Sequence, residues 1–274
     1  MKKILVPTDF SIQAENALKV AAQLAKTNKC EIYLLHILEI PLHKVDALNS
    51  YNNLPEAIYF MKLARKQFEE LMAKDYLKGL KVHDHVEFQE IFKGVFHQCE
   101  KHKIDLIIMG SNGADGLKEM MIGSNTEKVV RTSDTPVLVV KREHETFKSQ
   151  NFVFASDFKE ESKKPFQKAM SFAKIFKSKM HLLMVNTPTN FITTDEAQRR
   201  MQNFVEELKF SNHTLNVYND MTIEKGIMNF SQSIQADLIG MSTHGRQGIS
   251  HFFNGSVSED LVNHAKRPVL TFKI

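Results

Sequence analysis

Three glycines that follow a short apolar run are the residues of this sequence best suited to bind a phosphate group. Gly110 ends the run, Gly113 follows after two intervening residues, and Gly123 follows after nine more, directly before Ser124. A glycine has no Cβ, so the backbone can approach a ligand closely at each of these points. A Gly-Ser pair that opens a helix also presents free backbone amides to an anion. The pattern therefore indicates a phosphate-binding loop.

A second loop of this kind occurs later in the chain, and both loops also permit an interpretation without a ligand. Ser124 with Glu127, and Ser256 with Glu259, have the spacing of a capping box, in which the two side chains satisfy amides at a helix start. The glycines would then serve only tight turns, since a glycine-rich turn is a signal of low specificity. Capping and phosphate binding do not exclude each other, and both interpretations stay open here.

Two aspartates are the candidate carboxylates. Asp9 and Asp157 each follow a short apolar run and are each followed by phenylalanine. Their position at the ends of predicted strands indicates ligand binding rather than catalysis.

These parallels belong to a tandem repeat of the whole chain. The first segments recur at an offset of 148 residues, and the segments from Asp105 onward recur at an offset of 132. The second copy is therefore 16 residues shorter, and the extra residues of the first copy lie within 41–81. We expect a first domain over 1–142, a linker over 143–150 and a second domain over 151–274.

Within each copy, short apolar runs alternate with amphipathic stretches. The spacing predicts helices over 11–26, 54–74 and 195–208, and Ser11 is the candidate N-cap of the first. It predicts third strands over 86–92 and 214–218, and fourth strands over 104–109 and 238–241. Apolar strands between helices are typical of a parallel sheet covered on both faces. We expect two tandem α/β domains of Rossmann-like type, each with a doubly wound five-stranded parallel sheet and its ligand at the carboxyl ends of the strands.

The order of these motifs resembles the universal stress protein family. The first copy has the family's loop pattern, together with Asp9 and the strand motif Leu34-Leu35-His36-Ile37. The resemblance covers nearly the whole chain, once in each copy. It implies a stress-response protein that binds a nucleotide, with ATP and Mg²⁺ as its cofactors, and that acts as a sensor or adaptor. The alternatives are a scaffold whose degenerate loops bind another ligand or none, and a slow ATPase.

The resemblance also implies site residues. In ATP-binding members, the aspartate and a residue after the Leu-Leu-His motif hold adenine, and the glycine loop holds ribose and phosphates. The implied adenine contacts of the first copy are Pro7, Asp9 and Ile37, and the implied sugar and phosphate contacts are Met109, Gly110, Gly113, Gly123, Ser124 and Asn125. The matching residues of the second copy are Asp157, Val185, Met241, Ser242, Gly245, Gly255, Ser256 and Val257.

Each copy departs from the family pattern at a different place. In the first, Asn112 and Ala114 flank the middle glycine where the family often has His and Arg, and Asp115 adds a negative charge. In the second, Ser242 replaces the first glycine and Ala155 replaces the proline. Backbone clearance is a stricter requirement than one exposed cation, so we favour the first copy for ATP.

Family members commonly dimerise through their last strands, which pair antiparallel. The matching segments here are 136–141 and 268–274. The resemblance therefore implies an intramolecular pseudo-dimer, which would also cover two exposed sheet edges. A further homodimer stays open.

Other chemistry is weakly indicated. His83 and His85 would share one face of a strand without an evident third ligand, and His97, Cys99 and His102 would spread around a helix. Structural zinc normally takes four ligands, so we expect no metal site. The loop motifs of P-loop enzymes, serine hydrolases and zinc proteases are absent from the sequence, so no catalytic residue is assigned.

Composition excludes several classes of protein. The formal net charge is only +4 and the charges are interspersed, which argues against nucleic-acid binding. No apolar stretch approaches the roughly 20 residues of a membrane span, and the run Ile4-Leu5-Val6 is too short for the core of a signal peptide. Two cysteines without a paired motif fit a reducing compartment. We expect a cytoplasmic protein.

Overall fold

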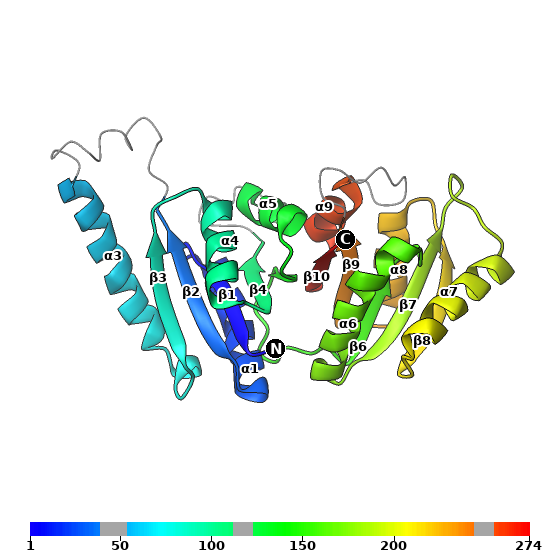
Figure 1. Cartoon of the computed structure of the whole chain (residues 1–274), viewed down its shortest axis with the longest axis horizontal. Helices are drawn as coiled ribbons and strands as arrows, with labels where there is room; N and C mark the ends of the chain where they lie inside the picture. The colour runs from blue at the N-terminus through cyan, green and yellow to red at the C-terminus, as the bar shows by residue number, and fades with distance from the viewer. Residues whose placement is uncertain (39–53, 112–122, 244–254) are drawn as a thin grey trace.

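The computed structural model describes residues 1–38, 54–111, 123–243 and 255–274, which form one ten-stranded sheet with helices on both faces (Figure 1). The strands lie in the order β3-β2-β1-β4-β5-β10-β9-β6-β7-β8. The first half contributes β1 (Lys3–Pro7), β2 (Glu31–Ile37), β3 (Val82–Glu87), β4 (Leu106–Gly110) and β5 (Val137–Val140). The second half contributes β6 (Asn151–Ala155), β7 (Lys179–Asn186), β8 (His213–Asn219), β9 (Leu238–Thr243) and β10 (Val269–Lys273).

Helices alternate with these strands. Those of the first half are α1 (Ile12–Asn28), α3 (Leu54–Met72), α4 (Ile91–His102) and α5 (Ser124–Thr132), with the 3₁₀ turn η1 (Asp75–Leu77). Those of the second half are α6 (Lys163–Phe176), α7 (Thr194–Leu208), α8 (Ile223–Ser233) and α9 (Gly255–His264), with the 3₁₀ turn η2 (Glu160–Ser162) before α6. The predicted helices over 11–26, 54–74 and 195–208 are thus confirmed as α1, α3 and α7. None of the described helices has the length and apolar character needed to cross a membrane.

The sheet is covered on both faces because its central strands are apolar throughout. Ile4, Leu5 and Val6 of β1 are all fully buried, and they divide between two cores on opposite faces of the sheet. β1 pairs in parallel with β2 on one side and with β4 on the other. This order confirms the doubly wound topology, and it places the carboxyl ends of β1 and β4 side by side.

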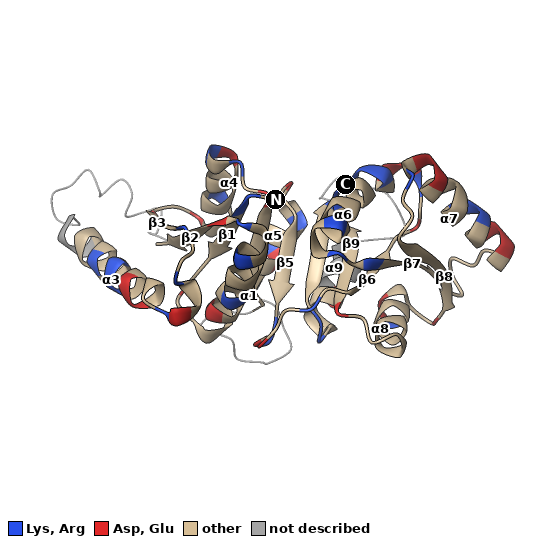
Figure 2. Ribbon diagram, turned by 90° about the horizontal axis from the view of Figure 1, so that it is seen from below, with Lys and Arg blue, Asp and Glu red and all other residues tan. Residues whose placement is uncertain are grey.

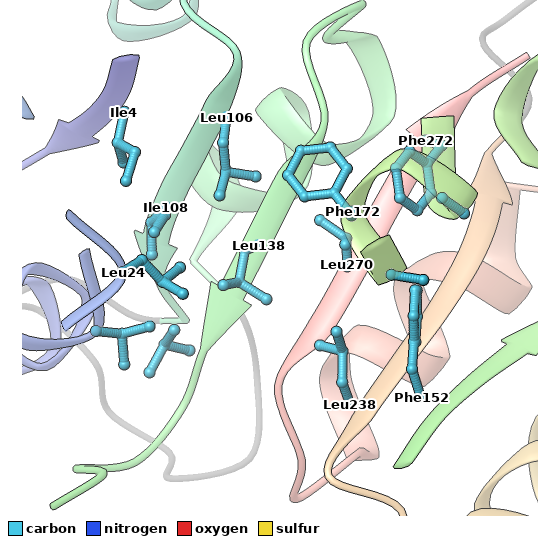
Figure 3. Packing of buried hydrophobic residues seen from close by; sticks show 14 of the residues in the cluster. Ile4, Leu24, Leu106, Ile108, Leu138, Phe152, Phe172, Leu238, Leu270 and Phe272 are labelled. Carbon is cyan, nitrogen blue, oxygen red and sulfur yellow. The ribbon is translucent and has the colours of Figure 1, made fainter. Parts of the chain in front are cut away.

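The two halves meet where β5 and β10 pair antiparallel, with Leu138 opposite Leu270. Phe172 of α6 and Phe272 of β10 belong to the apolar cluster that continues across this junction (Figure 3). The last strands therefore pair as the family resemblance implied, and one chain contains the pseudo-dimer.

The segment between β5 and β6 is held against α1. Gln23 donates from Nε2 to the backbone oxygen of His144 at 3.0 Å, and its Oε1 accepts from the backbone N–H of Phe147 at 2.6 Å. Lys19 forms an ion pair with Glu143. These contacts give the expected linker a defined path along the first half, although the domain boundaries themselves stay proposals.

The predicted strand over 86–92 is wrong. The strand is β3, which runs from Val82 to Glu87, and Ile91 begins helix α4. β3 is an edge strand, so its residues are only partly buried and include the polar run from His83 to His85. The apolar residues Ile91 and Phe92 belong to helix α4 and pack against the core that contains Leu5, which we call the second core.

Charged residues cover the outer helices without separating by sign. Figure 2 shows that α3 and α7 each carry both basic and acidic side chains. On α7, for example, Arg199 pairs with Asp195 at i,i+4 spacing.

Candidate functional site

Asp9 lies exposed just beyond the carboxyl end of β1, beside the end of β2. Its Oδ1 accepts from the backbone N–H of Ser11 at 3.0 Å and from the Ser11 hydroxyl at 2.6 Å. The Ser11 Oγ also accepts from the backbone N–H of Ala14 at 3.2 Å and so caps α1, as the sequence predicted. The carboxylate is thereby tied to the helix start at the point where the strand order reverses.

Phe10 helps to position this carboxylate, a role that the sequence did not reveal. Its φ of 62° lies in the left-handed region, which is unusual for a residue with a large side chain. The ring packs against His36 and Phe68 at centroid distances of 4.6 and 5.1 Å, and its backbone N–H donates to the Thr8 Oγ1 at 2.9 Å. Phe158 repeats this conformation in the second half, with φ of 53°. Such strain persists where packing enforces it, often at binding sites. The Asp-Phe pair after each first strand was the available signal.

Ile37 ends β2 half-buried, and α4 packs directly against it. A Cβ at Gly94 would lie 2.6 Å from the Ile37 Cδ1, so a side chain at this position would displace the end of the Ile37 side chain. Gly226 of α8 stands in the same relation to Val185, where the corresponding distance to Cγ1 is 2.4 Å. Both implied adenine contacts are therefore positioned by a glycine in the helix that follows the third strand.

Gly110 ends β4, and the backbone of α1 passes close to it. A Cβ at this position would lie 2.7 Å from both the carbonyl carbon and the carbonyl oxygen of Gln13. Met109, the residue before it, is buried in the second core. The first turn of α1 thus fits beside the end of β4 only because residue 110 has no side chain.

The start of α5 forms the other side of the candidate site. Its N-cap is Gly123 rather than Ser124, and among the described residues no side chain caps it. The backbone N–H of Gly123 donates to the Ser111 oxygen at 2.6 Å, which ties the helix start to the end of β4. The capping box expected for Ser124 and Glu127 is therefore not formed. Ser124 and Asn125 are both exposed in the first turn of this helix.

Several implied site residues cannot be placed. Gly113 and Gly245 lie outside the described residues, as do the flanking residues 112, 114, 115, 244 and 246. For Gly255, Ser256 and Val257 the structure describes the helical backbone of α9 but not the side chains.

In the second half, Asp157 is buried where Asp9 is exposed, with 2% of its surface accessible. Its Oδ1 accepts from the Ser162 hydroxyl at 3.0 Å and from the backbone N–H of Lys159 at 3.2 Å. Its Oδ2 lies 3.5 Å from the Lys159 Nζ. Val185 is also buried. The fold thus brings corresponding residues together in both halves, but the adenine-side residues are accessible only in the first.

Two hydroxyl groups lie buried at the carboxyl end of β9. The Ser242 Oγ and the Thr243 Oγ1 have no hydrogen-bond partner within the part of the chain that the structure describes. A buried hydroxyl without a partner costs about 1–3 kcal/mol. The second half therefore has buried hydroxyl groups at the end of β9, and its Asp157 and Val185 are also buried.

The histidines of β3 and α4 form a ring cluster around Tyr33. His83 and His85 stack on the Tyr33 ring at centroid distances of 4.6 and 5.9 Å, and His102 lies 4.7 Å from it. His85 and His102 also stack on each other at 5.0 Å. Burial lowers the pKa of both His85 and His102 below the ordinary value. His85 and His102 are therefore neutral at pH 7 and pack against Tyr33.

The remaining candidate metal ligands are separated. His97 lies 2.9 Å from the Glu87 carboxylate through its Nδ1. Cys99 is buried, and burial raises the pKa of its thiol to about 12, so it is not a thiolate at neutral pH. Within the described ranges, no three His, Cys, Asp or Glu side chains are grouped as a metal site would require.

Comparison with known proteins gives a consistent result. The model of the universal stress protein family matches the chain twice, over residues 1–141 and 148–273. Universal stress protein MJ0577 of Methanocaldococcus jannaschii is 37% identical over 158 residues, which cover 52% of this chain and 96% of that protein. Universal stress protein Slr1230 of Synechocystis is 23% identical and aligns along the full length of both chains. The crystal structure of a universal stress protein from Archaeoglobus fulgidus has the same fold, with a TM-score of 0.69 at 20% identity over 99% of this chain and 98% of that one.

Proposed function

Because the chain belongs to the universal stress protein family and carries the family fold in each half, we propose that it is a stress-response protein that binds ATP in its first half. In this role it acts as a cytoplasmic sensor or adaptor, and the bound nucleotide changes how it meets its partners. The second half serves as the paired scaffold of the pseudo-dimer.

The observation that carries this proposal is the edge formed by β1, β2 and β4 in the first half. Asp9 is exposed there, Ile37 is half-buried beside it, and Gly110 lets the first turn of α1 pack closely against the end of β4. A carboxylate can accept from the exocyclic amine of adenine, and an aliphatic side chain can pack on the base. These two residues supply both kinds of contact.

The start of α5 supports the phosphate end of the same site. Because no side chain among the described residues caps Gly123, the first amides of the helix can donate to an anion. The positive end of the helix dipole favours the same charge. Mg²⁺ would offset part of the phosphate charge, which Asp115, two residues after Gly113 in the sequence, otherwise opposes.

A scaffold without nucleotide is the second candidate, and the second half favours it. Asp157 and Val185 are both buried there, so the residues implied to hold adenine are not accessible. The two candidates differ in stoichiometry. The first predicts one nucleotide for each chain, whereas a scaffold predicts none.

Calorimetric titration of ATP, with and without Mg²⁺, separates them. We expect one site in the wild type and at least tenfold weaker binding in Asp9→Asn, because a hydrogen bond to a charged group contributes about 1.5–3 kcal/mol. Asp75→Asn is the matched control, since it makes the same change at an exposed carboxylate in η1. Wild-type protein without detectable binding would exclude the nucleotide role. Release of phosphate above the no-protein background would instead point to a slow ATPase.

A further inference from the structure

The two halves differ at one residue of the strand that carries the site. Gly110 ends β4 in the first half, and the repeat places Ser242 at the matching position of β9. The helix that passes this position also differs. α1 begins at Ile12, whereas its counterpart α6 begins three residues later, at Lys163.

The residues between these helix starts form the 3₁₀ turn η2. Glu160–Ser162 of η2 match residues 12–14, which are the first α-helical residues of the first half. A Cβ on Gly110 would lie 2.7 Å from the Gln13 carbonyl and 3.1 Å from the Ala14 nitrogen. The second half thus has a 3₁₀ turn in place of an α-helical turn at the segment that matches residues 12–14. In the first half, this is the segment that a Cβ at position 110 would meet. A 3₁₀ turn is wound more tightly than an α-helix, so it can withdraw from such a contact.

The 3₁₀ turn η2 also contributes a hydrogen bond to the buried Asp157. Ser162 lies in η2, and its hydroxyl donates to the Asp157 Oδ1 at 3.0 Å. Its counterpart in the first half is Ala14, which has no hydroxyl and lies in the α-helix. The Lys159 amine lies 3.5 Å from the other carboxylate oxygen. Asp157 is therefore buried between Ser162 and Lys159, whereas Asp9 accepts from the Ser11 hydroxyl and stays exposed.

The loop that follows β7 is also held by hydrogen bonds at the carboxyl end of the strands. Asn186 at the end of β7 donates from Nδ2 to the Ile192 oxygen at 2.9 Å and accepts from the Ile192 N–H at 3.4 Å. Asn186 and Thr187 are buried together with Val185. This loop adds to the closure around the position implied for adenine.

We propose that the Cβ of Ser242 closes the second half to nucleotide, because it holds the start of α6 in a 3₁₀ turn that buries Asp157. Ser242 is therefore a specificity-determining residue that acts through η2 and does not itself contact the nucleotide. The inference rests on the proposed function only for the choice of ATP as the probe.

A second difference between the halves must be separated from this one. Ser11 caps α1 with its hydroxyl, whereas the matching residue before η2 is Lys159, whose side chain does not cap the turn. Lys159→Ser restores the capping side chain without removing the Cβ of Ser242. Ser242→Gly removes the Cβ, and Ser242→Ala keeps it while removing the hydroxyl.

The test measures the geometry of the turn and the number of bound nucleotides on the full chain. We expect the backbone ¹³Cα shifts of residues 160–162 to move toward α-helical values in Ser242→Gly but not in Ser242→Ala or Lys159→Ser. Titration with MgATP should give two nucleotides for each chain in Ser242→Gly and one in the wild type and both controls.

The outcomes are distinct. Unchanged shifts in Ser242→Gly, converted shifts in either control, or two nucleotides in the wild type would each overturn the proposal. If the first half binds ATP, converted shifts without a second nucleotide would overturn it as well. Should the wild type bind none, the proposed function fails, but a shift change confined to Ser242→Gly still supports this inference.

Discussion

Lys141 and Lys273 each reach across the junction to the last helix of the opposite half. The Lys141 amine donates to the backbone oxygen of Asn263 near the end of α9, and the Lys273 amine donates to that of Thr132 at the end of α5, at 3.2 Å. A cation is favourable at the carboxyl end of a helix, where the last carbonyls lack partners within the helix. The pseudo-twofold relation of the halves is thus repeated in a pair of exchanged helix caps.

The two caps are not electrostatically equivalent. Lys273 also lies 3.0 Å from the Asp134 carboxylate, whereas the residue that matches Asp134 in the second half is Lys266. Burial, and to a smaller degree the charge of Arg142, lower the pKa of Lys141 to about 8. The junction therefore contains one lysine with a carboxylate partner and one whose charge is disfavoured by the fold.

Replacing Lys141 should change how stability depends on pH. Its folded-state pKa lies below the ordinary value of 10.5, so the folded state is penalised for binding the proton. This penalty is fully present below about pH 8 and is relieved as the pH rises from 8 to 10.5. Between these values, we expect the free energy of unfolding of the wild type to rise by on the order of 1 kcal/mol relative to Lys141→Met, after discounting for solvent screening.

Urea unfolding at several pH values between 7 and 10.5 measures this difference. Lys273→Met is the matched control, and we expect it to lose stability at pH 7 because Asp134 and the end of α5 lose their cation. Parallel pH curves for the wild type and Lys141→Met would show that Lys141 carries no such penalty.

Ser242→Ala should stabilise the protein. The Ser242 hydroxyl is buried and has no hydrogen-bond partner among the described residues, so removing it relieves an unmet desolvation cost of about 1 kcal/mol. The control is Ser133→Ala, because the Ser133 hydroxyl is also buried but donates to the Thr135 oxygen at 2.8 Å. Chemical denaturation should move the midpoints of the two variants in opposite directions. A lower midpoint for Ser242→Ala would mean that its hydroxyl has a stabilising partner.

Acid should weaken the edge of the first half through the rings around Tyr33. Burial lowers the pKa of His85 and His102, so the unfolded chain binds more protons than the folded one just below pH 6.5. Stability is then retained above that pH and lost as the pH falls toward the folded-state values. Lys3 and Lys101 lie near these rings and oppose their protonation, whereas Asp84 and Glu87 near His85 favour it.

The double variant His85→Phe and His102→Phe keeps the stacked rings but removes their protonation. We expect its unfolding midpoint to fall less than that of the wild type between pH 7.5 and 5.5. His97→Phe is the control, because His97 is more exposed and lies outside the cluster, beside Glu87. Equal losses in the wild type and the double variant would assign the acid sensitivity to other groups.

Much of this architecture could be predicted because the chain is an internal repeat whose two copies can be compared with each other. Matching segments revealed the two halves and the ends of β1 and β6 with their Asp-Phe pairs, and the family resemblance implied that the last strands pair at the junction. Ser11 was recognisable as a cap because it directly precedes an amphipathic run. These features depend on local pattern and on order along the chain, both of which a sequence displays directly.

The features that escaped prediction depend on distant contacts. The bounds of β3 were predicted wrongly because an edge strand needs no continuous apolar run. The apolar Ile91 and Phe92 belong to the following helix. The turn η2 was missed because Glu160 and Glu161 are ordinary residues for a first helical turn, so no local pattern distinguishes a 3₁₀ turn from an α-helix there. The positive φ of Phe10 depends on packing against Phe68 of α3. None of these contacts is visible in a local pattern.

Gly110→Ser should reproduce in the first half the geometry of the second. The new Cβ would meet the backbone of Gln13 at 2.7 Å, so the first turn of α1 has to move, at a cost of about 1–3 kcal/mol. We expect the α-helix to begin later than Ile12, which the ¹³Cα shifts of residues 12–14 would report, and MgATP binding to be lost. Gly110→Ala should have both effects, because it introduces the same Cβ without a hydroxyl. Ser111→Gly, which alters the next residue without adding a Cβ, should keep the helix start at Ile12. A Gly110→Ser protein with unchanged shifts and wild-type affinity would show that α1 tolerates a side chain at this position, and the different helix starts of the two halves would then need another cause.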